Sequence, residues 1–261
     1  MVHFVGAGSG AVDLITVRGK KLVDEADVVI YAGSLVNPEL LSSCKKDCKI
    51  YNSATMTLEE VIAVMEESEK ENKVTVRLHT GDPCLYGAIR EQMDLLEEKG
   101  ISYDVCPGVS SFCGAAAALQ AEYTLPDVSQ SVVITRMAGR TPVPEKESIE
   151  KWAAHQSTMV IFLSMGLLKE LEERLVAGGY REDTPAAIVY KATWPEEKVF
   201  HCTVSTLEKT ARENQITKTA LIVVGNVLNS TYERSKLYDP GFTTEFRKGT
   251  DSGTNALKNG A

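Results

Sequence analysis

The chain has 261 residues, of which 43% are hydrophobic and 25% charged, and its formal net charge is −8 at pH 7. This composition is that of a soluble protein with room for two domains, and the excess of acidic residues argues against a nucleic-acid partner, which needs clustered positive charge. No apolar run approaches the roughly 18 residues of a membrane span, and the N-terminus begins as a strand, unlike a signal peptide. We therefore expect a cytoplasmic protein with no membrane partner.

Two short apolar runs near the N-terminus, residues 2–7 and 28–31, are typical of buried parallel strands. Between them, apolar residues recur at helical spacing: Leu14, Val17, Leu22 and Val23. The segment therefore predicts a strand, a crossover helix and a second, parallel strand.

The same alternation continues along the first part of the chain. Thr57 and Glu60 form a capping box at the start of one helix, and a later helix is expected to end at Gly100. An alanine-rich run at residues 114–119 predicts a further, closely packed helix. We therefore predict an α/β fold in which residues 1–118 form an N-terminal domain with a doubly wound, mostly parallel sheet.

A second domain is expected at residues 128–245, after a linker at residues 123–127. Its predicted strands begin at Val132 and continue at 158–163, 186–190, 199–204 and 220–224. Residues 194–197 join two of these strands and are too few for a crossover helix, so this sheet should be mixed. The polar stretch 246–261 has no periodicity and is predicted to be a disordered tail.

Three apolar strands end in glycine-containing loops, at residues 5–10, 81–83 and 106–111. Ligands gather at the carboxyl ends of strands in open α/β sheets, so these loops predict one shared pocket. In the second loop, Gly81 allows a ligand to approach the backbone closely, and Asp82 suits a ligand that carries amines or hydroxyls. The alternative is an ordinary turn in which Asp82 caps the next helix.

The first loop also fits the pattern Gly-x-Gly-x-x-(Gly/Ala) of dinucleotide-binding enzymes, which hold a pyrophosphate at a helix N-terminus. A nicotinamide site also needs a carboxylate after the second strand, about 20 residues further on. Here that strand ends at Tyr31, and Asp27 comes before it. An NAD-dependent oxidoreductase therefore stays open as an alternative, but the pattern is incomplete.

The cysteines and histidines do not form a pattern of metal ligands. The six cysteines are scattered without a Cys-x-x-Cys pair, so we expect reduced thiols and no metal site. No Ser/His/Asp or Cys/His arrangement is evident. Asp104 and His79 are conceivable proton acceptors near the predicted loops, but neither is favoured, so the catalytic residue is unknown.

In this order, the three loops resemble the tetrapyrrole (class III) methyltransferase family, with its Val-Gly-x-Gly-Pro-Gly, Gly-Asp-Pro-x-x-Tyr-Gly and Pro-Gly-x-Ser-Ser motifs. Ser9 departs from the family, which usually has proline there. Within the family, residues 31–37, 57–60 and 135–144 resemble the enzymes of cobalamin biosynthesis that methylate carbon 11 of precorrin-4 or cobalt-precorrin-4.

Two positions separate the chain from the uroporphyrinogen methyltransferases of the same family. Those relatives carry an aspartate, assigned as the catalytic base, where this chain has Ala32, and a lysine where it has Ser53. Neither alanine nor serine can move a proton usefully. The resemblance therefore favours the carbon-11 step, with a uroporphyrinogen or another precorrin methylase as the alternative.

The resemblance implies a homodimer of two-domain chains that binds S-adenosylmethionine in the cleft between the domains and takes a tetrapyrrole substrate. It implies eight cofactor contacts: Thr80, Gly81, Asp82, Leu85, Ser110, Ser111, Met165 and Ala192. A substrate fringed with carboxylates needs positive side chains at the mouth of the site of such an acidic protein. Arg136 and Arg140, in a turn-rich segment after a strand, are our candidates.

Overall fold

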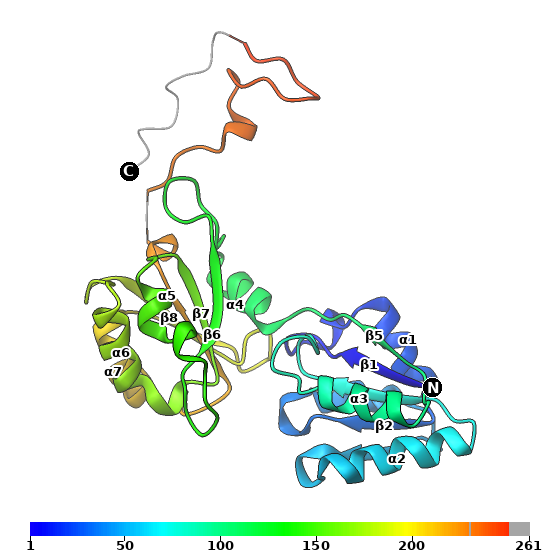
Figure 1. Ribbon diagram of the computed structural model, residues 1–261. Coiled ribbons are helices and arrows are strands. Elements are labelled where there is room, and N and C mark those ends of the chain that lie inside the picture. The colour runs from blue at the N-terminus through cyan, green and yellow to red at the C-terminus, as the bar shows by residue number, and fades with distance from the viewer. Residues whose placement is uncertain (230, 251–261) are drawn as a thin grey trace.

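The structure is a computed structural model that describes residues 1–229 and 231–250. It contains two five-stranded sheets, one formed by strands β1 to β5 and the other by β6 to β10. Figure 1 shows each sheet with its own helices, as two bodies joined through the loop that precedes α4. The prediction of an α/β protein with two domains is confirmed.

The first sheet is entirely parallel, and its strands lie in the order β3-β2-β4-β1-β5. The strands are β1 Val2–Gly6, β2 Val28–Tyr31, β3 Lys49–Asn52, β4 Thr75–His79 and β5 Tyr103–Cys106. Because parallel strands run in one direction, the loops that follow them all leave the sheet at the same edge. The three glycine-containing loops follow β1, β4 and β5, which are neighbours in this order.

Helices cover both faces of the first sheet, which confirms the doubly wound arrangement. They are α1 Val17–Glu25, α2 Leu58–Lys70 and α3 Arg90–Glu98. On one face, Val23 of α1 lies in a buried cluster with Val5. On the other face, Met65 of α2 and Leu96 of α3 share a cluster with Phe4. The two clusters are separated by the sheet, whose alternate side chains point to opposite faces.

Local sequence signals differ in how well they predicted the helix starts. The capping box is confirmed, since the Thr57 N–H donates to Glu60 Oε2 at 2.7 Å and the Glu60 N–H donates to Thr57 Oγ1 at 3.3 Å. The placement of Leu14 and Val17 on one apolar helix face is wrong. Leu14 belongs to a separate 3-10 turn, and Val17, the first residue of α1, is 91% exposed, because Thr16 caps the helix between them.

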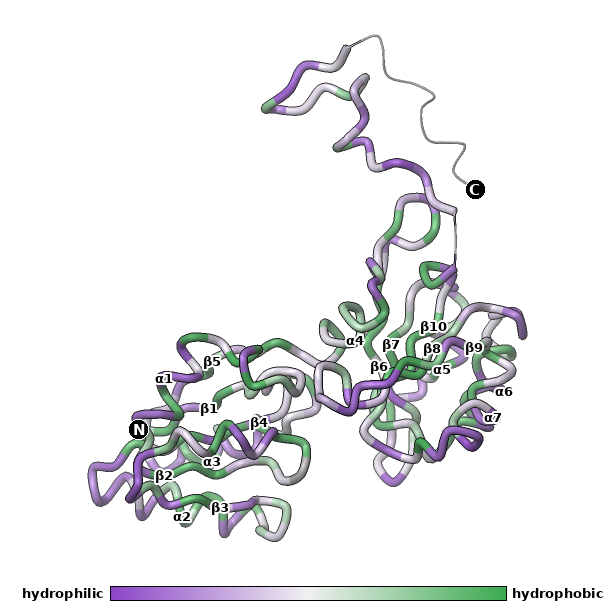
Figure 2. The backbone as a smooth tube through the Cα atoms, turned by 180° about the vertical axis from the view of Figure 1, so that it is seen from behind, coloured by the Kyte–Doolittle hydropathy of each residue, from purple (hydrophilic) through white to green (hydrophobic). Residues whose placement is uncertain are grey.

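The second sheet is mixed, as predicted, with strand order β6-β7-β10-β8-β9. The strands are β6 Val132–Arg136, β7 Thr158–Phe162, β8 Pro185–Tyr190, β9 Lys198–Thr203 and β10 Ala220–Val224. Only β6 and β7 pair in parallel, and the short connection at residues 194–197 joins the antiparallel pair β8 and β9. Helices α5 Ile149–Ala153, α6 Leu168–Ala177 and α7 Leu207–Glu213 pack on one face. Figure 2 shows hydrophobic colour concentrated in the strands and hydrophilic colour on the outer turns of these helices.

Helix α4 (Ser111–Leu119) contains the predicted alanine-rich run, but it packs on the second sheet and not on the first. Its Ala115 is fully buried in a cluster with Val160 and Val189, on the face opposite to α6 and α7. The small side chains of the helix allow this close approach. The placement of this helix in a domain of residues 1–118 is therefore corrected, since the chain crosses to the second sheet before Ser111.

After β10, the chain leaves the second sheet, and residues 231–250 extend away from both bodies (Figure 1). Their one regular element is the 3-10 turn Lys236–Tyr238, and residues 246–250 contain no helix or strand. The remainder of the predicted disordered tail, 251–261, lies outside the described residues. Within the described part of the chain, no helix is long and apolar enough to cross a membrane.

Candidate active site at the junction of the two sheets

The three glycine-containing loops meet at the edge of the first sheet. Gly81 donates its N–H to the Gly8 carbonyl at 2.8 Å and accepts the Gly8 N–H at 3.3 Å, which joins the first loop to the second. A side chain at Gly6 would collide with the backbones of Gly81 and Gly108. These glycines are therefore required mainly because three backbones pack against one another. The prediction that the three loops form one site is supported by this geometry.

Asp82 connects the second loop to the third. Its Oδ1 accepts the Cys84 N–H and its Oδ2 accepts the Gly108 N–H, both at 2.8 Å. Burial alone would raise the pKa of Asp82, but these hydrogen bonds outweigh burial and hold the pKa below its ordinary value. The alternative role as a helix cap is wrong, because α3 begins only at Arg90.

The first loop also contacts the hairpin of the second sheet. Ser9 Oγ lies 3.0 Å from Thr193 Oγ1, and the Ala11 N–H donates to the same oxygen at 3.1 Å. The indole ring of Trp194 lies so close to Gly10 that a Cβ there would overlap it. The loop that could have held a pyrophosphate thus has its backbone engaged by protein groups, which argues against the oxidoreductase alternative.

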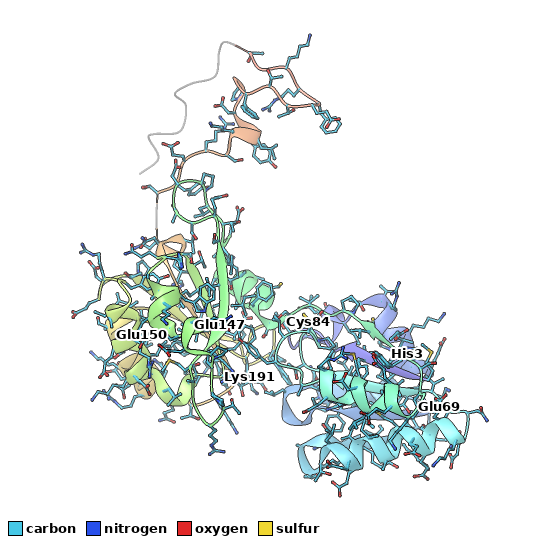
Figure 3. The ribbon with its side chains drawn as sticks, viewed as in Figure 1. His3, Glu69, Cys84, Glu147, Glu150 and Lys191 are labelled. Carbon is cyan, nitrogen blue, oxygen red and sulfur yellow. The ribbon has the colours of Figure 1, made fainter. Side chains whose placement is uncertain are left out.

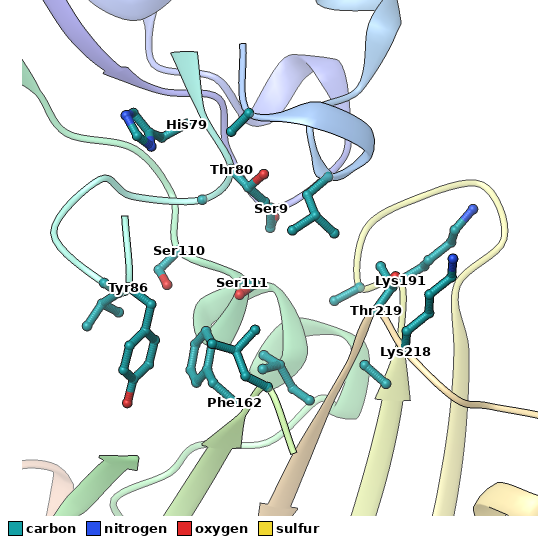
Figure 4. A pocket seen from close by; sticks show the side chains of 18 of the residues that line it. Ser9, His79, Thr80, Tyr86, Ser110, Ser111, Phe162, Lys191, Lys218 and Thr219 are labelled. Atoms are coloured by element: carbon teal, nitrogen blue, oxygen red, sulfur yellow. The ribbon is translucent and has the colours of Figure 1, made fainter. Parts of the chain in front are cut away.

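A cavity of about 480 Å³ lies where these loops face the second sheet (Figure 4). Its size is ordinary for a site that holds a small organic ligand. The structure brings all eight sequence-predicted cofactor residues into its lining: Thr80, Gly81, Asp82, Leu85, Ser110, Ser111, Met165 and Ala192. Five of them come from the loops after β4 and β5, Ser111 is the first residue of α4, Met165 follows β7 and Ala192 follows β8.

Sequence reasoning missed several other residues of this lining. The main ones are Arg77, Tyr86, Phe162, Leu163, Lys191, Trp194, Lys218 and Thr219. Tyr86, Leu163, Lys191 and Thr219 each have a positive φ between 46° and 57°. Such backbone conformations are unfavourable for side-chain-bearing residues, and they cluster at functional sites. Tyr86 belongs to the Gly-Asp-Pro-x-x-Tyr-Gly motif, but no sequence signal marked the other three positions, because their strain arises from the tertiary contacts around each loop.

The two residues considered as proton acceptors lie in different places. Asp104 bonds to His3 Nδ1 at 2.7 Å and does not line the cavity. Figure 3 places His3 at the far end of the first domain, away from Lys191 at the junction. His79 does line the cavity, but burial and the nearby positive charge of Arg77 lower the pKa of His79 to about 3. Its imidazole is therefore neutral and weakly basic at pH 7.

Neither of the arginines proposed for the substrate lines the cavity. Arg136 directs its guanidinium to backbone carbonyls of its own loop, at 3.2 Å from Met137, 3.1 Å from Thr141 and 2.8 Å from Pro142. Arg140 is exposed in the same loop. Their role in substrate binding stays a prediction, and the cations that do line the cavity are Arg77, Lys191 and Lys218.

Comparison with known proteins identifies the family. The family model described as Tetrapyrrole (Corrin/Porphyrin) Methylases matches residues 1–208. The chain is 53% identical over 248 residues to a cobalt-precorrin-4 C(11)-methyltransferase of Methanocaldococcus jannaschii, covering 95% of this chain and 96% of that protein. It is 47% identical over 255 residues to the protein of the same name from Priestia megaterium, covering 96% of this chain and 99% of that protein.

Solved structures agree with this result. A cobalt-precorrin-4 methyltransferase has a TM-score of 0.86 and 46% identity, covering 88% of this chain and 96% of that chain. A uroporphyrin-III C-methyltransferase of Thermus thermophilus, complexed with S-adenosylhomocysteine, shares the fold with a TM-score of 0.72 and 22% identity, covering 89% of this chain and 95% of that chain. This chain therefore belongs to the tetrapyrrole (corrin/porphyrin) methylase family.

Proposed function

We propose that the chain transfers a methyl group from S-adenosylmethionine to carbon 11 of precorrin-4 or cobalt-precorrin-4 in cobalamin biosynthesis. The observation that carries the proposal is the cavity at the junction of the two sheets, in a chain that is 53% identical to a cobalt-precorrin-4 C(11)-methyltransferase. The proposal includes both forms of the substrate, because a relative that is 44% identical is named a precorrin-4 C(11)-methyltransferase.

The cavity wall suits a nucleoside with a sulfonium side chain. Thr80 and Gly81 are small residues that line this wall, which lets a ligand approach the backbone closely. Leu85 and Met165 provide apolar contacts, and a methionine adapts well to an irregular ligand surface. We propose that the eight sequence-predicted residues hold S-adenosylmethionine here.

The reaction requires few chemically active side chains from the protein. S-adenosylmethionine supplies a methyl group on sulfur, and the nucleophilic carbon must attack it in line. The protein contributes by holding the two molecules in this geometry and by excluding water, and good alignment can lower the barrier by several kcal/mol. We assign no catalytic base, because Asp82 is committed to two backbone amides and His79 is a weak base.

The charge of the cavity suits a substrate with several carboxylates. The charged residues of its lining are Arg77, Lys191 and Lys218 against Asp82, in a chain whose formal net charge is −8, and Lys191 also lies 3.4 Å from a carboxylate oxygen of Glu196. Figure 4 shows Lys191 and Lys218 reaching toward the same side of the cavity. A local positive field of this kind attracts an anionic ligand to an otherwise acidic protein.

We also propose a homodimer in the cytoplasm. The proposal of a homodimer is based on the family resemblance. Analytical sedimentation of the purified chain would measure its oligomeric state. The cytoplasmic location is supported by the six cysteines, all of which are free, as is typical of a reducing compartment.

The test of function is incubation with methyl-labelled S-adenosylmethionine and an enzymatic supply of precorrin-4 or cobalt-precorrin-4. NMR of the product should locate the new methyl group on carbon 11. A methyl group at another carbon would point to another precorrin methylase, and methylation of uroporphyrinogen III would favour that alternative. Binding of NAD in place of S-adenosylhomocysteine in calorimetry would overturn the proposal and favour the oxidoreductase.

A further inference from the structure

Arg77 is a buried cation without an anionic partner. It lies in the middle of β4, lines the cavity and is only 6% exposed. Its Nε donates to Gln92 Oε1 at 3.0 Å and its Nη1 donates to the Ile30 carbonyl at 3.1 Å. Among the described residues, Nη2 has no hydrogen-bond partner, and no carboxylate lies within ion-pair distance of the guanidinium.

Such a group is costly to bury. Burial lowers the pKa of Arg77 to about 10, yet the guanidinium remains charged at pH 7. Buried charges in proteins are normally paired, because their desolvation is otherwise uncompensated. The acidic residue of the lining is Asp82, and both of its carboxylate oxygens accept backbone amides instead. The chain therefore leaves this positive charge to be neutralised from the cavity.

His79 provides a second, independent observation at the same wall. It lies two residues after Arg77 on the same face of β4, is 4% exposed and also lines the cavity. Its Nε2 is fully buried and has no hydrogen-bond partner within the described part of the chain. Because its imidazole is neutral, one of the two ring nitrogens of His79 can donate a hydrogen bond to an anion without adding charge.

We propose that Arg77 and His79 form a subsite that binds one carboxylate of a ligand, with Arg77 as the ion-pair partner and His79 as an additional hydrogen-bond donor. A guanidinium fork that is held at Nε and Nη1 presents its remaining donors in a fixed plane, which matches a carboxylate. The inference rests on the proposed function, which supplies two sources of that carboxylate. One is an acid side chain of the tetrapyrrole, and the other is the methionine carboxylate of S-adenosylmethionine.

The experiment compares the parent protein with Arg77→Met and Arg77→Lys. Calorimetry measures the affinity for S-adenosylhomocysteine and for 5′-methylthioadenosine, which lacks the amino-acid carboxylate, and kinetics measure KM and kcat for the tetrapyrrole. If the cofactor carboxylate binds here, Arg77→Met weakens S-adenosylhomocysteine about 10- to 100-fold and leaves 5′-methylthioadenosine unchanged. If a substrate acid binds here, both nucleosides bind as in the parent and KM rises by a similar factor.

In both cases Arg77→Lys should recover only part of the loss, because a single ammonium cannot replace the planar fork. Unchanged values for all three ligands would overturn the subsite, and so would an equal weakening of all three, which indicates general damage to the loops. Either of these results for the variants would overturn the subsite alone, because the parent protein would still transfer the methyl group. A parent protein that binds neither nucleoside and transfers no methyl group would contradict the proposed function itself.

His79→Phe tests the subsite even if the Arg77 variants fold poorly. His79 packs against Phe4, with ring centroids 6.2 Å apart, so a phenyl ring at this position keeps an aromatic contact. The variant removes a buried, unsatisfied nitrogen and should raise the melting temperature, while it weakens the same carboxylate ligand about three- to tenfold. A merely structural histidine would not combine higher stability with weaker binding, and equal or tighter binding would overturn its role.

Discussion

Asp82 joins two loops of the site, so its effect on ligand binding is expected to be indirect. Asp82→Ala leaves the amides of Cys84 and Gly108 without their acceptors, and hydrogen bonds to charged groups contribute about 1.5–3 kcal/mol each. We expect a lower melting temperature and roughly tenfold or greater loss of affinity for S-adenosylhomocysteine, as measured by thermal melts and calorimetry. Asp183→Ala is the control, since that carboxylate bonds to Arg181 on the surface. Parent-like affinity in Asp82→Ala would contradict the bridging role.

The pKa of Asp82 predicts a pH dependence of the same bridge. Because its pKa is lowered in the folded protein, the carboxylate stabilises the fold fully above the ordinary value of about 3.9 and loses this effect as the pH falls through the lowered pKa. S-adenosylhomocysteine affinity should fall below pH 4 in the parent. Asp82→Asn, which cannot titrate, should lack that step, and a step of equal size in this variant would assign the titration to another group.

Gly81 and Gly100 allow backbone strain to be separated from close packing. Both have a left-handed φ, +64° and +67°, but a Cβ at Gly81 would lie 3.3 Å from the Ser111 nitrogen, whereas the space around Gly100 is open. Gly100→Ala should therefore cost only the conformational penalty of about 1 kcal/mol and leave S-adenosylhomocysteine affinity unchanged. Gly81→Ala should destabilise more and weaken binding as well. Equal effects of both substitutions in denaturant unfolding and calorimetry would refute the packing argument.

At the scale of elements, the hairpin between β8 and β9 closes the site against the first glycine loop. Gly10→Ala places a methyl group where the Trp194 ring lies, and the positive φ of Gly10 adds backbone strain. We expect the hairpin to be displaced and S-adenosylhomocysteine to bind at least tenfold more weakly, while circular dichroism of the sheets is retained.

A double variant separates the overlap with the Trp194 ring from the backbone strain at Gly10 as causes of the weaker binding. In Gly10→Ala combined with Trp194→Ala the overlap is removed, so part of the affinity should return, although the backbone penalty persists. Purely additive losses in this double-mutant cycle would show that the ring and the loop do not interact.

For the whole molecule, the contrast between a negative chain and a positive cavity should govern substrate capture. Lys218 lines the cavity, is exposed and forms no ion pair with any described residue. Lys218→Gln should raise KM for the tetrapyrrole several-fold, reduce its dependence on salt and leave S-adenosylhomocysteine affinity near the parent value. Lys209→Gln, on the outer surface of α7, is the matched control.

The same assay tests the arginines that sequence reasoning proposed. If Arg140→Gln changes KM as much as Lys218→Gln does, the substrate also uses the loop after β6, and the sequence-based proposal holds for that residue. If Lys218→Gln changes KM no more than Lys209→Gln does, the positive charge of the cavity does not contribute to tetrapyrrole binding. Initial rates at two salt concentrations are sufficient to distinguish these results.

Much of the fold could be predicted because its signals are local. Apolar runs mark the buried strands β1 and β2, the Thr57 and Glu60 pair marks the start of α2, and the short connection at residues 194–197 indicates an antiparallel pair. Strand β3 carried no such signal, because it is an edge strand whose side chains are mostly exposed. Helix α4 was assigned to the wrong sheet, since an alanine-rich run predicts close packing but does not indicate which sheet the helix packs on.

The sequence by itself determined most of the strands, the doubly wound and mixed sheets and the family resemblance, because these follow from local periodicity and from short motifs, and the resemblance in turn implied the eight residues that share the cavity lining. Only the tertiary structure decided what each residue does there. It commits Asp82 to the Gly108 loop, places Trp194 over Gly10, removes Asp104 from the site and leaves Arg77 without a carboxylate partner among the described residues. These outcomes depend on contacts between residues that are far apart in the chain, and neither composition nor spacing encodes which of them will meet.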